Sequence, residues 1–270
     1  MSLNFNLLKE KLSKMDRQKS EQKDSLWRPP EGKSIIRIVP RKEDRTYPFV
    51  ELSFHYGFGK KPYLSPTSYG RPDPIVEFGK AIVDELFQNN NNPTKDEMRE
   101  TYARAKPFSP SLRTFIPIIV RGEEDKGVRY MSFGQTVFTD IATIMNDEDY
   151  GDITDVKSGT DIVVEYIPKE KSDTKYAKTK VFAKRNQSPL ADSPEKINEF
   201  LNNQPDLTEI FKEPTYEELL TVLSTYLGTD VPVDEPTVNV PLTSATATKS
   251  VETKSKAVDD FMDEFDQAFN

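Results

Sequence analysis

Alternating apolar and polar positions predict short strands through much of the chain. The pattern occurs in KSIIRIVPR, YPFVELSFHYGF, RTFIPIIVRG, GVRYMSFG, TDIVVEYIPK and KTKVFAKR. The acidic turn EEDK joins the third segment to the fourth, and EKSDTKYA joins the last two. We expect Pro40 to end the first strand, because proline has no N–H to donate to a sheet.

Helical signals lie between and after these strands. Asp73 as cap and Pro74 in the first turn predict one helix, and a Thr94–Glu97 capping box predicts the next. TVFTDIATIM predicts a third, and a last helical region runs from PEKINEFLNN to YEELLTVLSTYLG and ends at Gly228. Five or so short strands with inserted helices favour an α+β fold built on a small, partly open barrel over a doubly wound parallel sheet.

Both ends of the chain differ from this body. Residues 3–19 show a helical period of leucines with lysines on the other positions. This segment is either a surface helix of its own domain or a helix offered to a neighbouring molecule. Residues 229–257 are rich in Thr, Val, Pro, Ser and Ala. They contain too few large apolar side chains to build a core, so we expect a flexible linker.

The last thirteen residues form a short acidic and aromatic segment. Their phenylalanines recur every four residues and would share one helical face. We predict that this tail binds partner proteins and competes with nucleic acid for basic surface elsewhere on the chain. The residues assigned to partner binding are Asp259, Asp260, Phe261, Asp263, Glu264, Phe265, Asp266 and Phe269.

The composition excludes several chemistries. The chain of 270 residues has no cysteine and one histidine, so disulfides, thiolate catalysis and Cys/His zinc sites are excluded. His55 lies in a predicted strand, and we interpret it as a strand residue and not as a catalytic base. No apolar run is long enough for a membrane helix and the N-terminus lacks the apolar block of a signal peptide, so we expect an intracellular protein without a membrane partner.

Charge is distributed unevenly along the chain. The net charge is −8, but residues 229–270 hold nine acidic and three basic side chains and therefore account for −6 of it. The other 228 residues carry only −2. Because local charge density decides which ligand a groove attracts, the overall acidity does not exclude nucleic acid.

Basic and aromatic residues coincide in three windows, residues 53–72, 99–121 and 169–187. Cations neutralise the phosphates of a single strand and aromatic rings stack on its bases, and neither contact reads sequence. We therefore predict binding of single-stranded DNA without catalysis or cofactor. The predicted contacts in these windows are Lys60, Lys61, Tyr63, Tyr69, Arg71, Tyr102, Arg104, Lys106, Phe108, Arg113, Lys171, Lys175, Tyr176, Lys178, Lys180, Phe182, Lys184 and Arg185, and Arg41, which lies outside the windows, is assigned to the same site.

Two other functions remain open at this point. The acidic run NDEDYGD at residues 146–152 could supply carboxylates to a metal-dependent nuclease, although two-metal chemistry needs acids from separate elements. Alternatively, the chain could be a scaffold that acts through its acidic tail and merely displays it on the folded body.

The order of several segments resembles a known family. IRIVP, RYMSFG and FAKRNQSPL, followed by a Thr/Ala-rich linker and the tip DDFMDEFDQAF, are similar to the single-stranded DNA-binding, helix-destabilising proteins of T-even-type bacteriophages. The resemblance implies an OB-fold core over residues 27–228, cooperative binding to single strands, and a role in phage DNA replication, recombination and repair in the host cell cytoplasm. It also implies phage replication and recombination proteins as partners of the acidic tail, residues 229–270. Arg37 matches the arginine of the family's strand motif, so the resemblance implies that it contacts DNA.

Two features depart from this family. The resemblance to its best-studied member implies a zinc site with one histidine and three cysteines as ligands. Of these residue types, only the histidine, His55, is present here. We therefore expect a subdomain around residues 55–100 to be held by packing, through the helix that begins at Asp73. The family's basic N-terminal motif, which links neighbours on DNA, is not reproduced. Within residues 1–26, the helix around Lys9 to Lys19, or the run Arg17-Gln18-Lys19-Ser20, is expected to substitute for it in self-association along DNA.

Overall fold

The sheet contains the segments in which the sequence predicts strands, and two shorter strands in addition. The computed structural model describes residues 25–228, all of which belong to one structural unit. Within them the strands are β1 (Leu26–Trp27), β2 (Gly32–Ile38), β3 (Val50–His55), β4 (Tyr63–Leu64), β5 (Ser111–Val120), β6 (Arg129–Phe133), β7 (Thr160–Ile167) and β8 (Lys178–Gln187). β2 ends just before Pro40, as predicted.

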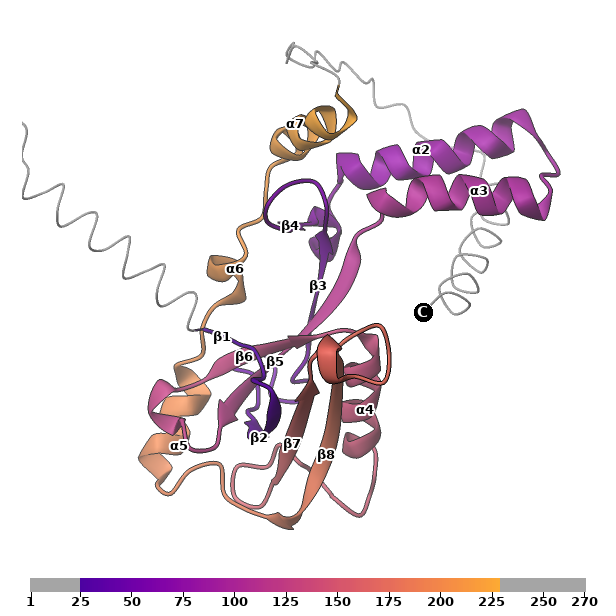
Figure 1. Cartoon of the computed structure of the whole chain (residues 1–270). Coiled ribbons are helices and arrows are strands. Elements are labelled where there is room, and N and C mark those ends of the chain that lie inside the picture. Colours follow the sequence, from indigo (N-terminus) through magenta and orange to yellow (C-terminus); the bar gives the residue numbers. More distant parts are fainter. Residues whose placement is uncertain (1–24, 229–270) are drawn as a thin grey trace, which may run out of the picture. The chain divides into compact units, whose positions relative to one another are not determined.

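Strand order defines an open, mixed sheet. The order is β1-β6-β5-β2-β7-β8, and β3 pairs with β5 beyond the end of β2. Neighbours are antiparallel except β1 and β6, which are parallel. β4 pairs only with β3 and forms a hairpin with it. This confirms the mixed α+β class (Figure 1).

Helices occupy the connections where caps predict them. Asp73 accepts hydrogen bonds from the N–H groups of Ile75 and Val76, the capping box of Thr94 is present, and Gly228 ends the last helix in the left-handed conformation that glycine adopts freely. The α-helices are α2 (Pro74–Asn89), α3 (Lys95–Ala105), α4 (Gln135–Met145), α5 (Pro194–Asn202), α6 (Leu207–Ile210) and α7 (Tyr216–Leu227). Short 3-10 turns are η1 (Pro66–Tyr69), η2 (Lys106–Phe108), η3 (Glu124–Lys126) and η4 (Lys169–Lys171).

The main core lies between the inner face of the sheet and α4. Ile36, Ile116, Ile118 and Ile162 point into it from three adjacent strands, and Ile141 enters from the helix. Period-two alternation places these strand residues on one face, so the polar residues between them point outward. α4 thus closes one end of the sheet beside β8 (Figure 1).

A second apolar layer covers part of the outer face. Val39 and Ile119 from the sheet pack against Leu190 and against Phe200 of α5. α5 and the segment after β8 therefore bury the outer face at this end of β2 and β5. At the other end of β5, Phe115 is buried against residues of β3, β6 and α6, so only the first residues of the strand are open to solvent.

An insertion between β2 and β5 forms its own small core. α2 and α3 lie side by side and antiparallel (Figure 1). Ile75 of α2 and Phe108 of η2 pack against Leu219 and Leu223 of α7. α7 follows the last strand in the sequence. The chain therefore returns from the sheet to the insertion and completes its core. The predicted helix of residues 3–19 and the acidic tail lie outside the described residues.

Candidate nucleic-acid interface

The β3–β4 hairpin presents the first basic window. Its turn, residues 56–62, exposes Lys60, Lys61 and Tyr56, and Tyr56 is 50% exposed. Tyr63 is half-buried and packs at the edge of the insertion core. The predicted site omitted Tyr56, although it lies in the same basic window. Neighbouring residues of a strand point to opposite faces, so an inward His55 would have predicted an outward Tyr56.

The η1 turn continues this surface. Tyr69 is 39% exposed, and the guanidinium of Arg71 lies 5.8 Å from the centre of its ring. Arg71 also forms an ion pair of 2.5 Å with Glu213. An arginine over a tyrosine face is stabilised by the ring quadrupole, so the pair is held as a unit on the surface.

The second window is divided between the surface and the interior. Arg104 and Lys106 are exposed at the end of α3. Arg113 is half-buried on the outer face of β5, 3.4 Å from both the carbonyl and the hydroxyl of Ser132 on β6. Tyr102 and Phe108, however, are only 3% and 6% exposed. The expectation that these two rings stack on bases therefore does not fit the structure.

Phe108 is buried because the helical insertion needs an aromatic core. Its ring centre lies 4.8 Å from that of Phe78 and 6.0 Å from that of Phe58. A β-carbon on Gly79 would come within 2.9 Å of Phe108, so the helix approaches the ring closely. Such packing leaves no face of the ring for a base.

The third window lies on the β7–β8 loop and on β8. Tyr176 is 75% exposed, and Lys175 beside it is exposed as well. Lys171 pairs with Glu31, and half-buried Lys178 pairs with Asp173 at 2.6 Å. These pairs fix the loop at its two ends, with Tyr176 at the solvent side between them.

β8 alternates between the core and solvent. Val181 and Ala183 pack into the main core, whereas Lys180, Phe182 and Lys184 are exposed, with Phe182 48% exposed. Arg185 is also exposed, but at the other end of the strand it lines a hollow of about 370 Å³ with Asp149 and Tyr150. Arg185 therefore lies away from the β7–β8 loop along the chain.

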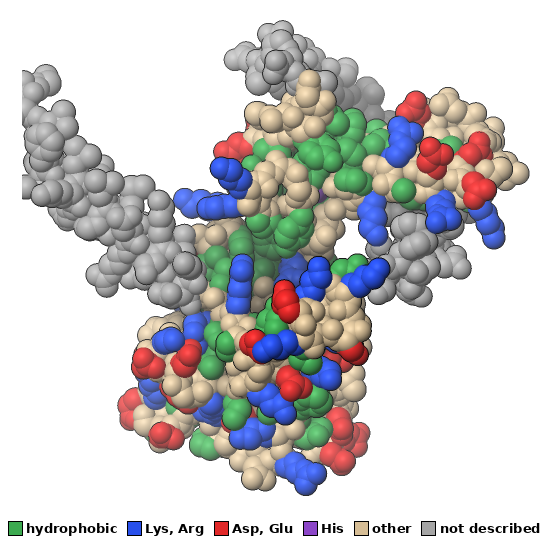
Figure 2. Space-filling model, viewed as in Figure 1, with side chains coloured by type: hydrophobic (Ala, Val, Ile, Leu, Met, Phe, Trp, Pro, Cys, Tyr) green, Lys and Arg blue, Asp and Glu red, His purple; other side chains and the backbone are tan. Residues whose placement is uncertain are grey.

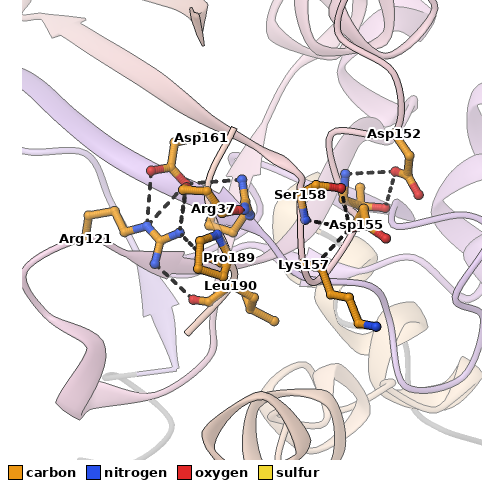
Figure 3. Close-up of polar contacts among 11 residues, drawn as sticks. Arg37, Arg121, Asp152, Asp155, Lys157, Ser158, Asp161, Pro189 and Leu190 are labelled. Carbon is orange, nitrogen blue, oxygen red and sulfur yellow. Dashed lines mark hydrogen bonds and ion pairs between the residues drawn. The ribbon is translucent and has the colours of Figure 1, made fainter. Parts of the chain in front are cut away.

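Arg37 corrects the prediction most clearly, because its side chain is fully buried. Figure 3 shows Asp161 between Arg37 and Arg121. Asp161 lies 3.3 Å from a guanidinium nitrogen of Arg37 and 2.9 Å from one of Arg121, and Arg37 also donates to the Ser188 carbonyl. Burial lowers the pKa of Arg37 and Asp161 opposes that shift. Arg37 thus fastens the segment after β8 to the sheet and cannot face DNA.

Arg41 also serves the fold. It is half-buried and donates a hydrogen bond of 2.9 Å to the carbonyl of Phe49, with Glu43 3.8 Å away. Arg121, inside the second window, donates to the carbonyls of Pro189 and Leu190 at 2.8 and 2.9 Å. Both arginines bind backbone carbonyls of loops, and each also faces a carboxylate, Glu43 or Asp161, so both guanidinium groups are engaged within the fold.

Several lysines of the three windows keep their charge available. Within residues 25–228, Lys60, Lys61, Lys175, Lys180 and Lys184 have no ion pair with another described side chain. Figure 2 shows Lys and Arg side chains both on the α2–α3 part and on the sheet part of the face in view. Unpaired surface lysines are the groups that release counterions when phosphates bind.

The zinc that the family resemblance implies does not fit the residues present. The chain has no cysteine, and in the described part no group of three or more His, Asp or Glu side chains is placed to hold a metal ion. His55 lies 2.9 Å from Asp73 and both side chains are fully buried. Two ligands of a tetrahedral zinc lie roughly 3.3 Å apart around a shared centre, so this distance is that of a direct hydrogen bond.

The acidic run proposed for a nuclease forms local turns. Asp147 accepts a hydrogen bond from the N–H of Asp149 at 3.0 Å, and Asp152 accepts from the N–H and the hydroxyl of Thr154 at 2.8 and 2.7 Å. These carboxylates bind their own backbone, as Asp does in Asx turns. As for membranes, none of the helices in residues 25–228 is long and apolar enough to cross a bilayer.

Exposed tyrosines beside unpaired lysines, on loops of an open sheet, are typical of proteins that bind single-stranded nucleic acid. The comparison with protein families gives the particular group: a model described as "gp32 DNA binding protein like" matches residues 30–228, and the chain belongs to this family. It is a single-stranded DNA-binding protein of phage replication and recombination, and it is not an enzyme. No curated protein matches the chain.

Proposed function

We propose that single-stranded DNA passes the exposed start of β5, around Arg113, and runs between the β3–β4 hairpin and the β7–β8 loop. The strand order supports this path. If β2, β5, β6, β7 and β8 are numbered one to five, their order in the sheet is 3-2-1-4-5, with α4 between the third and the fourth. This is the order of an OB-fold, which binds oligonucleotides on strands two and three and with the loops 1–2 and 4–5.

The basic windows coincide with these binding elements. Loop 1–2 corresponds to residues 39–110 and carries Lys60 and Lys61, and loop 4–5 corresponds to residues 168–177 and carries Lys175 and Tyr176. Arg113 lies near the start of strand two and contacts Ser132 of strand three. We define the basic face by its exposed and half-buried members, namely Tyr56, Lys60, Lys61, Tyr63, Tyr69, Arg71, Arg104, Lys106, Arg113, Lys171, Lys175, Tyr176, Lys178, Lys180, Phe182 and Lys184.

This composition favours binding without sequence preference. Lysine and arginine neutralise phosphates whatever the base, and a tyrosine ring stacks on any base for about 1–3 kcal/mol. A protein that binds only the unpaired state shifts hairpins and duplex ends toward single strands by mass action. Helix destabilisation then needs no chemical step.

Salt dependence tests this function directly. The affinity of the full chain for a thymidine homopolymer should fall steeply with salt, with a slope of about −0.7 in log K against log salt for each phosphate contact. A duplex of the same length should bind much more weakly, because its bases are stacked away from the tyrosines. A flat salt response, or equal affinity for both forms, would contradict the proposal.

We also infer roles for the two ends of the chain, of which residues 1–24 and 229–270 lie outside the described residues. Residues 1–26 would mediate self-association along DNA, and residues 229–270 would recruit phage replication and recombination proteins in the host cell cytoplasm. The excess of nine acids over three bases in the tail supports competition with DNA for the basic face.

Two tail variants separate charge from hydrophobic contact. Replacing Asp259, Asp260, Asp263, Glu264 and Asp266 by their amides should tighten DNA binding at low salt. Replacing Phe261, Phe265 and Phe269 by alanine should leave DNA affinity unchanged and abolish partner binding. If a chain ending at Gly228 binds DNA and partners as the full chain does, the tail has neither role.

A further inference from the structure

Three buried polar side chains meet at the base of the insertion. His55 ends β3, Ser65 follows β4, and Asp73 caps α2, and their exposures are 0%, 0% and 1%. The Oδ2 atom of Asp73 lies 2.9 Å from Nε2 of His55 and 2.5 Å from the hydroxyl of Ser65. We call these three residues the His55 network.

Asp73 is the shared acceptor of this network. Its second oxygen accepts from the N–H groups of Ile75 at 2.9 Å and Val76 at 3.3 Å, so one carboxylate accepts four hydrogen bonds. Burial is the largest single influence on its pKa and raises it, but the hydrogen bonds from His55 and Ser65 together lower the pKa below its ordinary value. The carboxylate form therefore fits this buried position.

The geometry also indicates which nitrogen of His55 carries a proton. Nε2 faces the carboxylate, and Nδ1 has no hydrogen-bond partner among the described residues, beside the ring of Phe58. A proton on Nε2 alone leaves no donor unpaired, which is the less costly arrangement in an apolar pocket. His55 thus acts as a donor to Asp73 and not as a metal ligand.

The network connects the elements that carry the basic face. Directly after His55, the chain enters the turn with Tyr56, Lys60 and Lys61. β3 pairs with β5 so that Leu52 lies opposite Arg113, and the N–H of Ser65 donates to the Ser53 carbonyl at 2.8 Å. The same three side chains therefore join the hairpin, the η1 turn and the first turn of α2.

We propose that the His55 network replaces a metal centre in this chain and positions the β3–β4 hairpin and the α2–α3 pair for single-stranded DNA. A metal ion would connect three segments through shared coordination. Here the Asp73 carboxylate connects β3, the residue after β4 and the first turn of α2 through hydrogen bonds. The proposal rests on the proposed DNA path, because positioning matters only if the hairpin contacts the strand.

Chelation is the first test. Incubation of the full chain with EDTA or 1,10-phenanthroline should change neither its thermal unfolding nor its affinity for a thymidine homopolymer, and metal analysis should find no stoichiometric zinc. Loss of affinity on chelation, restored by added zinc, would overturn the proposal.

Asp73→Asn tests the positioning role, because asparagine still caps a helix but presents a donor where the network needs an acceptor. We expect the dissociation constant to rise about tenfold, the factor for losing a hydrogen bond to a charged group. Amide exchange should accelerate in β3, β4 and α2 and remain slow in β7 and β8. Ser65→Ala should give the same pattern to a smaller extent.

Asp152→Asn is the matched control, since Asp152 also accepts a hydrogen bond from a backbone N–H, that of Thr154, and lies outside the network in the loop before β7. It should leave affinity and exchange in β3 unchanged. If Asp73→Asn accelerates exchange throughout the sheet, the network is a general core element and the positioning role is wrong. If Tyr176→Ala weakens binding but Asp73→Asn does not, the DNA path holds and the network proposal fails; if neither weakens binding, the path itself fails.

Discussion

At the scale of single residues, burial divides the aromatic and basic side chains into two classes. Tyr102 and Tyr176 both lie in basic windows of the sequence, yet one is 3% and the other 75% exposed. Arg37 is fully buried against Asp161, whereas Lys60 and Lys61 face solvent. Residue type and window therefore define a set of candidates, and side-chain exposure selects among them.

Tyr176 gives the sharpest residue-level prediction. Tyr176→Ala should weaken binding to a thymidine homopolymer by about 1–3 kcal/mol, the contribution of one stacked base, without changing the salt slope. Tyr176→Phe keeps the ring and should retain most of the affinity. Fluorescence titration at several salt concentrations measures both quantities. Equal losses in the two variants would show that the ring does not stack.

At the scale of elements, local sequence patterns predicted much of what the structure contains. The six longer strands, the Asp73 cap and the Thr94 capping box follow from period-two alternation and cap chemistry, which act within a few residues. β1 and β4 were not predicted because two residues carry too little periodicity. They exist through long-range contacts, as when β1 pairs with β6.

The site was predictable only as far as local patterns reach. The loops of the three windows are exposed, as turn sequences usually are. The burial of Arg37 depends on Asp161 and Ser188, which lie more than 120 positions further along the chain. The buried partnership of His55 with Asp73 likewise depends on the β3–β4 pairing, which no local pattern specifies.

The β7–β8 loop and β8 together form one basic element. The contribution of its lysines to DNA binding can be measured separately from that of the Tyr176 ring. Lys175→Ala and Lys180→Ala should each reduce the salt slope by about 0.7, because each removes one phosphate contact. Lys196→Ala is the control, since Lys196 lies on α5 and pairs with Glu199 at 2.9 Å. If Lys196→Ala lowers the slope as much as the loop variants do, the effect reflects net charge and not this element.

At the scale of the whole molecule, two separate parts of the chain build the insertion. The residues between β3 and β5 form most of it, and α7, after the last strand, packs on α2 and η2. The core of the insertion is therefore built from residues that precede β5 in the sequence and from residues that follow β8. Its orientation relative to the basic loops depends on a few buried contacts, of which the His55 network is the most polar.

Acid should open the insertion before the sheet. The pKa of Asp73 lies below its ordinary value of 3.8, so the carboxylate contributes stability that is present above that value and is lost as pH falls below it through the lower folded-state pKa. The titratable groups near Asp73 are His55 on β3 and Tyr216 on α7, and Tyr216 also bonds to Glu77. Hydrogen exchange between pH 5 and 2.5 should show β3 and α2 losing protection first.

Asp73→Asn supplies the control for this prediction, because it removes the titrating group. In that variant the selective acid step in β3 and α2 should disappear. Simultaneous loss of protection in β7, β8 and α2 of the unaltered chain would contradict the expectation.

Photochemical crosslinking tests the DNA path most directly. The full chain is irradiated on a saturating thymidine homopolymer, and the attached peptides are identified by mass spectrometry. The proposed path predicts adducts on Tyr176 of the β7–β8 loop and on Tyr56 or Tyr69 beside the β3–β4 hairpin. Adducts confined to Tyr216 and Tyr226 of α7, with none on these loops, would contradict it.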